Sequence, residues 1–152
     1  MEIKIDNLES STVKQLLHEH HEEMLKHSPA ESVHALNLDS LKTPEITFWT
    51  AWINGELAGC AALKKLDDTD AEIKSMRTAN EFLRKGVAAK LLTHILSFAK
   101  GQSYQIVSLE TGTANAFIPA QTLYKRFGFH VCQPFSTYQK DPYSMFLTKV
   151  IN

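Results

Sequence analysis

Apolar residues recur at helical spacing in the stretch from Val87 to Lys100. Steps of one, three and four residues place them on a single helix face. The residues on this repeat are Val87, Leu91, Leu92, Ile95, Leu96 and Ala99. Gly101 follows where a glycine commonly ends a helix. The pattern predicts an amphipathic helix over Val87–Lys100 that packs one face against a core.

A second helical pattern lies near the start of the chain. Thr12–Gln15 has the form of a capping box, in which side chains satisfy free backbone N–H groups at a helix start. Apolar residues continue along one side to about Lys26, and Ser28-Pro29 ends the helix because proline cannot continue it. Two shorter helices are predicted near Asp39–Lys42 and over Ile118–Phe127.

Apolar runs of strand length alternate with these helices. Ile46–Ile53 is apolar at odd and even positions, which predicts a central strand buried on both faces, and Asn54-Gly55 predicts a two-residue hairpin. The strand after the helix Val87–Lys100 should run parallel to the strand before it, through a right-handed crossover. The other predicted strands are Glu2–Asp6 at an edge, Glu56–Leu66, Ala71–Arg77, Gln105–Leu109, Phe129–Cys132 and Ser144–Val150.

Composition and charge narrow the class of protein. The chain has 152 residues, 43% of them hydrophobic, so we expect one domain over residues 1–152 with a proper core. Its 16 basic and 17 acidic residues leave a net charge of −1, which argues against nucleic-acid binding and a polybasic membrane anchor. Residues 1–10 lack the apolar core of a signal peptide. Cys60 and Cys132 form no CxxC pair, so we expect a cytoplasmic protein and leave a disulfide open.

The segment Leu83–Ala88 (LRKGVA) joins the predicted strand Ala71–Arg77 to the long helix. Backbone N–H groups at a helix start have no intrahelical partner and carry a partial positive charge. Gly86 allows a tight turn and a close ligand, and Arg84 and Lys85 add cations. The combination predicts a phosphate or pyrophosphate site. The motif alone is more often a basic loop with nothing bound.

Two further motifs make this loop more specific. LRKGVA resembles the acyl-CoA pyrophosphate loop of the GNAT superfamily of N-acetyltransferases, [QR]-x-x-G-x-[GA]. Gly86 and Ala88 match that pattern, whereas Leu83 stands where Gln or Arg is usual. Leu123–Phe129 (LYKRFGF) matches the later family signature [LF]-Y-x-x-x-G-F. Glu72 precedes the loop at the spacing of members that use a strand glutamate as base.

The resemblance implies an α/β (α+β) fold and a transferase activity. In that fold a mixed, mostly antiparallel sheet of about six to seven strands has a splayed parallel pair in its middle and about four flanking helices. The implied activity is N-acetyltransfer from acetyl-CoA, without a metal, to a primary amine of a small molecule or peptide by direct attack. A non-catalytic CoA-binding or sensor module and an α/β interaction domain without CoA are the alternatives. We expect a monomer or homodimer.

The resemblance also assigns a cofactor site. Backbone freed where the parallel strands splay would pair with the pantetheine arm, and the Met76 N–H would bind the oxyanion. The predicted CoA-binding residues are Ser75, Met76, Arg77, Leu83, Arg84, Lys85, Gly86, Val87 and Ala88. Many members hold the pantetheine with an Asn seven residues before the signature Tyr, where this chain has Phe117, with Asn115 out of register.

Two side chains are predicted to act on protons. Burial inside a sheet disfavours a charged carboxylate, so Glu72 could accept the ammonium proton directly or through water. A surface Glu paired with Lys74 or Lys64 is the alternative, and water alone can serve as base. Tyr124 aligns with the Tyr that in many members faces the thioester sulfur, and it is predicted to protonate the leaving thiolate. The alternative is a Tyr that only packs on the sheet.

The acceptor site is the least defined part of the prediction. The connection Pro29–Thr43 lies where many members line this site, so His34 is a candidate contact, with a packed His as the alternative. The segment Glu110–Thr113 is expected to leave the end of its strand. Residues that could edge the pocket are Lys74, Arg77, Glu110, Thr111, Gly112, Thr113, Phe135, Tyr138 and Tyr143. Cations there would suit a carboxylate, and aromatic rings a flat or apolar body.

Several histidines on the first predicted helix raise the question of a metal. They are His18, His20, His21 and His27. The zinc-protease pattern H-E-x-x-H fails because Glu22 stands where the second His is needed. His18 could share a face with His21 or Glu22, but a solvated polar face is the favoured interpretation.

Overall fold

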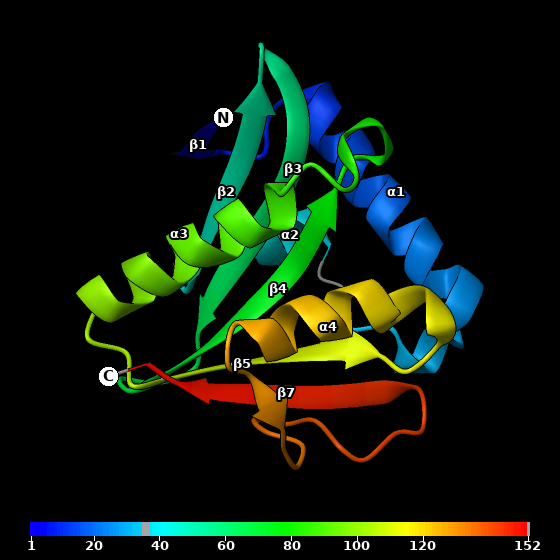
Figure 1. The fold of residues 1–152 in the computed structure, drawn as a ribbon, viewed down its shortest axis with the longest axis vertical. Coiled ribbons are helices and arrows are strands. Elements are labelled where there is room, and N and C mark those ends of the chain that lie inside the picture. The colour runs from blue at the N-terminus through cyan, green and yellow to red at the C-terminus, as the bar shows by residue number, and fades with distance from the viewer. Residues whose placement is uncertain (35–36, 152) are drawn as a thin grey trace.

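The computed structural model describes residues 1–34 and 37–151, which fold around one sheet. Seven strands lie in the order β1-β2-β3-β4-β5-β7-β6, and all neighbours are antiparallel except β4 and β5 (Figure 1). The strands are β1 (Glu2–Ile5), β2 (Ile46–Ile53), β3 (Glu56–Lys65), β4 (Asp70–Thr78), β5 (Ile106–Gly112), β6 (His130–Val131) and β7 (Ser144–Val150). The helices are α1 (Ser11–His27), α2 (Leu38–Leu41), α3 (Val87–Gly101) and α4 (Ile118–Arg126), with 3₁₀ turns at Ala30–Ser32, Asn80–Phe82 and Asn115–Phe117. This architecture confirms the predicted fold class.

Helices cover both faces of the sheet. Figure 1 shows α3 and α4 in front of it. β2 confirms the prediction of a strand buried on both sides, because Phe48 packs in one core cluster with Leu16 of α1, and Trp49 packs in the other with Leu91 of α3. Burying a large apolar side chain stabilises a fold by about 1.5–3 kcal/mol. The two clusters therefore hold the strands that frame the site described below. Among the described helices, none has the length and apolarity that a membrane span requires.

β4 and β5 are paired over only part of their length. The parallel register joins Asp70–Ile73 to Ile106–Leu109, whereas β5 stays paired with β7 as far as Gly112. On its other side β4 has a bulge opposite β3. There Ser75 takes a left-handed conformation (φ 54), and its carbonyl oxygen accepts a hydrogen bond from Cys60 Sγ at 3.3 Å. A bulge bends its strand and increases the local twist, and the ends of β4 and β5 diverge (Figure 1).

The start of α1 and the end of α3 differ from the predicted positions. α1 is capped by Ser10 rather than Thr12, because Ser10 Oγ accepts a hydrogen bond from the Val13 N–H at 3.2 Å. The predicted capping box at Thr12–Gln15 was therefore wrong. α3 continues through Gly101, because the left-handed residue that turns the chain after it is Ser103 (φ 66).

β5 is longer than predicted. Pairing with β7 extends from Ile106 to Gly112, opposite Ser144. The prediction that Glu110 and the two residues after it leave the end of the strand was therefore wrong. Antiparallel hydrogen bonds hold Glu110 in the sheet at the level where β4 has already turned away.

Candidate active site

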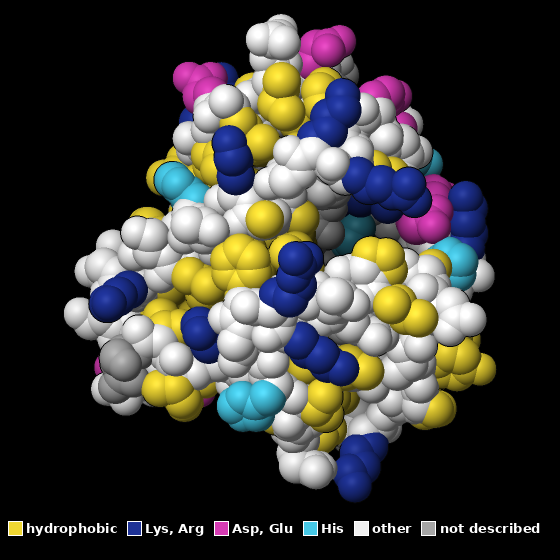
Figure 2. Space-filling view, viewed as in Figure 1, with side chains coloured by type: hydrophobic (Ala, Val, Ile, Leu, Met, Phe, Trp, Pro, Cys, Tyr) yellow, Lys and Arg dark blue, Asp and Glu magenta, His cyan; other side chains and the backbone are white. Residues whose placement is uncertain are grey.

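A cavity of about 910 Å³ lies where β4 and β5 diverge. Its lining comes from both faces of the sheet, with Gly86 and Tyr124 on the side of α3 and α4, and His20 and His34 on the side of α1. The cavity therefore passes through the sheet. Figure 2 shows a hollow on the α3–α4 face, with Lys and Arg side chains around it. Such a passage can hold one ligand on each face and bring them together in the middle.

The start of α3 forms one end of this cavity. Arg84 (φ 63) and Gly86 (φ 81) take left-handed conformations, and Gly86 directly precedes the helix. The Lys90 N–H donates to the Gly86 carbonyl at 3.1 Å, so the N–H groups of residues 87–89 have no partner within the helix. No described atom lies within 4 Å of a Cβ built at Gly86. Its backbone conformation, rather than crowding, therefore requires glycine. Free N–H groups at a helix start can bind an anion.

The cavity brings together most of the residues predicted to bind CoA. Those in its lining are Ser75, Met76, Arg77, Leu83, Arg84, Gly86, Val87 and Ala88. Lys85 is not among them, because its Nζ lies over the Phe82 ring, 5.4 Å from the ring centre.

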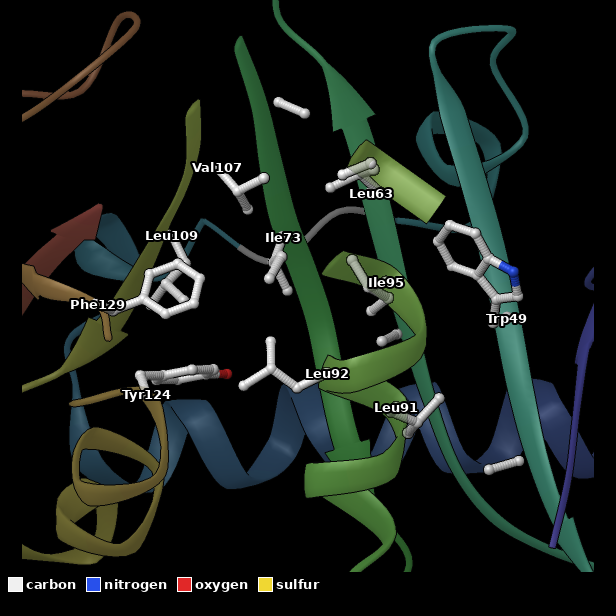
Figure 3. Packing of buried hydrophobic residues seen from close by; sticks show 14 of the residues in the cluster. Trp49, Leu63, Ile73, Leu91, Leu92, Ile95, Val107, Leu109, Tyr124 and Phe129 are labelled. Carbon is white, nitrogen blue, oxygen red and sulfur yellow. The ribbon is translucent and has the colours of Figure 1, made fainter. Parts of the chain in front are cut away.

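Tyr124 enters the cavity from α4. Its hydroxyl lies 3.5 Å from Met76 Sδ, and its ring packs edge-on against Phe129. Figure 3 shows the hydroxyl directed from α4 toward α3 and β4. Burial raises the pKa of Tyr124 to about 12, because the phenolate is poorly solvated there. A tyrosine is protonated at neutral pH already at its ordinary pKa of about 10, so this phenol holds a proton that it can donate to a nearby anion.

Glu72 belongs to a buried hydrogen-bond network on the α1 face. Tyr138 donates its hydroxyl proton to Glu72 Oε2 at 2.6 Å, and Lys74 Nζ donates to Tyr138 at 2.6 Å and to Glu72 Oε2 at 3.2 Å. The Glu72 and Lys74 side chains are 3% and 8% exposed. Burial, followed by the charge of Glu72, raises the pKa of Tyr138 far above its usual range. Pairing with Lys74 was foreseen as an alternative at the surface, but the pair is buried.

His34 and Glu110 form a second pair at the opening. His34 Nδ1 lies 2.8 and 2.7 Å from the two carboxylate oxygens of Glu110, and its ring centre lies 5.1 Å from that of Tyr138. Both residues line the cavity. The sequence indicated each as a possible pocket residue but gave no sign that they pair, because 76 positions separate them.

Arg77 and His20 both line the cavity on its α1 face. Arg77 Nε is buried and has no hydrogen-bond partner among the described residues, and Nη2 donates to Asn80 Oδ1 at 3.3 Å. Burial, then the charges of Arg77 and His21, lowers the pKa of His20 to about 4. His20 is therefore neutral at pH 7.

The histidines of α1 do not share one environment. His18 is 65% exposed and His21 is exposed, as a solvated face requires, but His20 lines the cavity. The favoured interpretation was therefore wrong for His20, since the sequence could not show that its helix face turns toward the sheet opening. Within residues 1–34 and 37–151, no three His, Cys, Asp or Glu side chains gather as a metal site would need.

Phe117 lines the cavity beside the start of α4. Its ring packs edge-on against His27 of α1 at 5.6 Å. A Cβ built at Gly112 would lie 2.3 Å from that ring, so Phe117 fits only over a glycine. Of the other predicted pocket residues, Thr111 lines the cavity, whereas Phe135 packs against Tyr138 and Phe146.

Known proteins share this sequence and fold. The model of the acetyltransferase (GNAT) family matches residues 12–129. The chain is 53% identical to YsnE of Bacillus subtilis over 149 residues, 98% of this chain and 99% of YsnE. It is 47% identical to YedL of Escherichia coli over 146 residues, 96% of this chain and 92% of YedL. Both are described as uncharacterized N-acetyltransferases. A GNAT family acetyltransferase from Elizabethkingia anophelis with acetyl-CoA bound has a similar fold, with a TM-score of 0.70 and 20% identity, covering 98% of this chain and 97% of that one.

Proposed function

The chain belongs to the acetyltransferase (GNAT) family and is an acetyl-CoA-dependent acyltransferase, and we propose that it moves the acetyl group to a primary amine of a small molecule or peptide by direct attack. The cavity through the sheet carries this proposal. It has an anion-binding helix start on one face and the carboxylates of Glu72 and Glu110 toward the other. A thioester and an amine entering from opposite faces would meet at the opening, already positioned for reaction.

The residues on the α3–α4 face fit acetyl-CoA. The free N–H groups at the start of α3, with Arg84 beside them, suit the pyrophosphate. The backbone of Ser75–Arg77 lies beyond the paired part of β4 and β5, so it can bond the amides of the pantetheine arm. Bound acetyl-CoA supplies the thioester carbon that the amine attacks.

The proton transfers follow from the side chains at the opening. Glu72, directly or through water, is the proposed base that removes a proton from the ammonium group. Its Oε2 already accepts hydrogen bonds from Lys74 and Tyr138, which favours the route through water. The amine then forms the C–N bond while the Met76 N–H stabilises the oxyanion. The C–S bond breaks, Tyr124 protonates the thiolate, and the second proton lost by nitrogen returns to Tyr124 through solvent.

A CoA-release assay across amino acids, polyamines, simple amines and peptides tests this proposal. Turnover with at least one of these amines is the expected result. If acetyl-CoA binds but no acceptor releases CoA, the chain is a CoA-binding or sensor module and the proposal fails.

We also propose a cytoplasmic location. Both cysteines carry free thiols, as is usual in a reducing compartment. Burial raises the pKa of the Cys60 thiol to about 12, so this side chain has no reactive thiolate. The thiol instead donates a hydrogen bond to the Ser75 carbonyl oxygen in the β4 bulge.

A further inference from the structure

We propose that the acceptor is a free amino acid and that the Arg77 side chain binds its carboxylate on the α1 face of the cavity. This inference rests on the proposed N-acetyltransferase function and specifies its substrate class. It assigns the Arg77 side chain a role separate from that of its backbone, which is proposed to pair with CoA.

Arg77 is a cavity-lining cation that forms no ion pair with another described residue. Its one side-chain hydrogen bond among these residues goes to the neutral amide of Asn80 at 3.3 Å. Its Nε is buried and unpartnered. Buried polar groups are nearly always hydrogen-bonded, and the guanidinium fork matches a carboxylate with two parallel bonds. A guanidinium that lines a cavity and forms no ion pair with the described residues therefore suits an anionic ligand.

The other cations of the lining have partners or lie elsewhere. Lys74 bonds Glu72 and Tyr138. Arg84 belongs to the loop before α3, and Arg126 to α4, both on the proposed CoA face. His20, beside Arg77, is neutral at pH 7 because burial and the nearby Arg77 lower its pKa to about 4. A neutral imidazole can add a hydrogen bond without repelling the guanidinium.

The bulge at Ser75 determines which face Arg77 occupies. In an uninterrupted strand, Glu72, Lys74 and Met76 would share a face, because side chains alternate. The extra residue in the bulge reverses the alternation. Met76 therefore packs toward Tyr124 on the α3–α4 face, and Arg77 lies beside His20 on the α1 face.

This placement limits the size of the acceptor. Met76, whose N–H is proposed to hold the acyl oxygen, and Arg77 are adjacent, and a strand rises by only about 3.3 Å per residue. The attacked carbon and the bound carboxylate are thus separated by no more than the reach of one arginine side chain. Glu110, which lines the opening beside His34, suits an ammonium group. An amino acid has both charges within a few bonds, whereas a polyamine or a peptide N-terminus lacks the neighbouring carboxylate.

Matched acceptors test the inference directly. Each free amino acid is compared with its own amide, which has the same size and the same amine but no carboxylate. The amide is the weaker base and has more neutral amine at a given pH, so a preference for the acid cannot arise from that source. We expect kcat/KM of the wild-type protein to favour the acid by about 10- to 100-fold, as a charge-assisted hydrogen bond would give.

Variants assign this preference to one side chain. Arg77→Gln should bring the acid-to-amide ratio of kcat/KM close to one, and Arg77→Lys should retain part of it, because the charge stays but the fork is lost. Lys100→Gln is the matched control, since it removes an exposed positive charge at the far end of α3 and should leave the ratio unchanged. Titration with acetyl-CoA shows whether each variant still binds the cosubstrate.

Three results would overturn the inference. Equal use of amino acids and their amides by the wild-type protein would do so while leaving the proposed function intact. An Arg77→Gln variant that loses acetyl-CoA affinity but keeps the acid-to-amide ratio would assign the side chain to CoA. Binding of acetyl-CoA without turnover of any amine would remove both proposals. If Arg77→Gln does not fold, the wild-type ratio and the thermal shift of the CoA complex with acid against amide still decide the question.

Discussion

Burial shifts the pKa of two titratable side chains of this cavity in the direction that favours the uncharged form. It raises the pKa of Tyr124 to about 12, and, with Arg77 and His21, it lowers that of His20 to about 4. In both cases the charged form loses the solvation it would have in water. The same physical cause thus gives a proton donor on the α3–α4 face and a neutral hydrogen-bonding group on the α1 face.

Replacing Tyr124 with Phe should slow turnover without loosening acetyl-CoA binding. The ring still packs on Phe129, and only the hydroxyl that protonates the thiolate is lost. General acid catalysis contributes about 10²–10⁴-fold, and we expect the low end because a CoA thiolate is a fair leaving group. Steady-state kinetics should show kcat and kcat/KM falling together, with KM nearly unchanged. A fall of less than about threefold in a well-folded variant would make Tyr124 a packing residue.

The depressed pKa of His20 predicts a loss of stability in mild acid. Unfolded chains bind this proton near pH 6.5, whereas the folded protein binds it only near pH 4. Between these values the unfolded state binds more protons, so stability falls as the pH falls. Thermal denaturation of the wild type and His20→Gln from pH 7 to 4 should show a shallower decline for the variant. His18→Gln, at an exposed position, should keep the wild-type slope, and parallel slopes for all three would contradict the prediction.

Among the elements, α3 and β3 approach each other closely at Gly59. A Cβ there would lie 2.8 Å from the Arg77 carbonyl oxygen, 2.9 Å from Val87 Cγ1 and 3.3 Å from Leu91 Cδ1. Because one of these atoms belongs to the backbone of β4, the contact cannot be relieved by a rotamer change. Gly59→Ala should therefore cost about 1–3 kcal/mol and lower the Tm by about 2–12 °C.

Gly101→Ala is the matched control for this substitution. Gly101 lies inside α3, and a Cβ there meets no described atom within 4 Å. Alanine has the higher helix propensity, by about 0.5–1 kcal/mol, so the Tm should rise by about 1–4 °C. Equal effects of Gly59→Ala and Gly101→Ala in a thermal melt would contradict the close approach of α3 to β3.

For the molecule as a whole, acetyl-CoA binding should stabilise the fold. A ligand at about one hundred times its Kd adds roughly 2.7 kcal/mol, and each kcal/mol moves the Tm of a domain of this size by about 2–4 °C. We expect a thermal shift of about 5–10 °C with acetyl-CoA and a smaller one with AMP, which lacks the pantetheine arm.

Gly86→Val locates the phosphate end of this site. A branched side chain at a left-handed residue is strained and crowds the helix start where the pyrophosphate would lie. The variant should lose most of the acetyl-CoA shift while melting cooperatively without ligand. An unchanged shift would place the phosphates elsewhere, and no shift in the wild type would remove the proposed CoA site.

Local patterns were sufficient to predict most of the elements. The apolar stripe of α3, the two-sided apolar run of β2 and the loop Leu83–Ala88 each depend on neighbours a few residues apart, and each lies where the sequence placed it. The ends of elements were less accurate. The cap at Ser10 and the extension of β5 to Gly112 depend on a competing local hydrogen bond and on pairing with β7.

The sequence thus established the family motifs, the order of strands and helices, and the two residues proposed to move protons, because these are properties of short segments. It could not join Tyr138 to Lys74 and Glu72 across 64 and 66 positions, or His34 to Glu110. Nor could it show that one extra residue at Ser75 turns Met76 toward Tyr124 and Arg77 toward His20. Alternation along a strand would have placed both on the opposite faces. The acceptor side of the cavity arises from that bulge, and a bulge forms only when β3 and β4 pair.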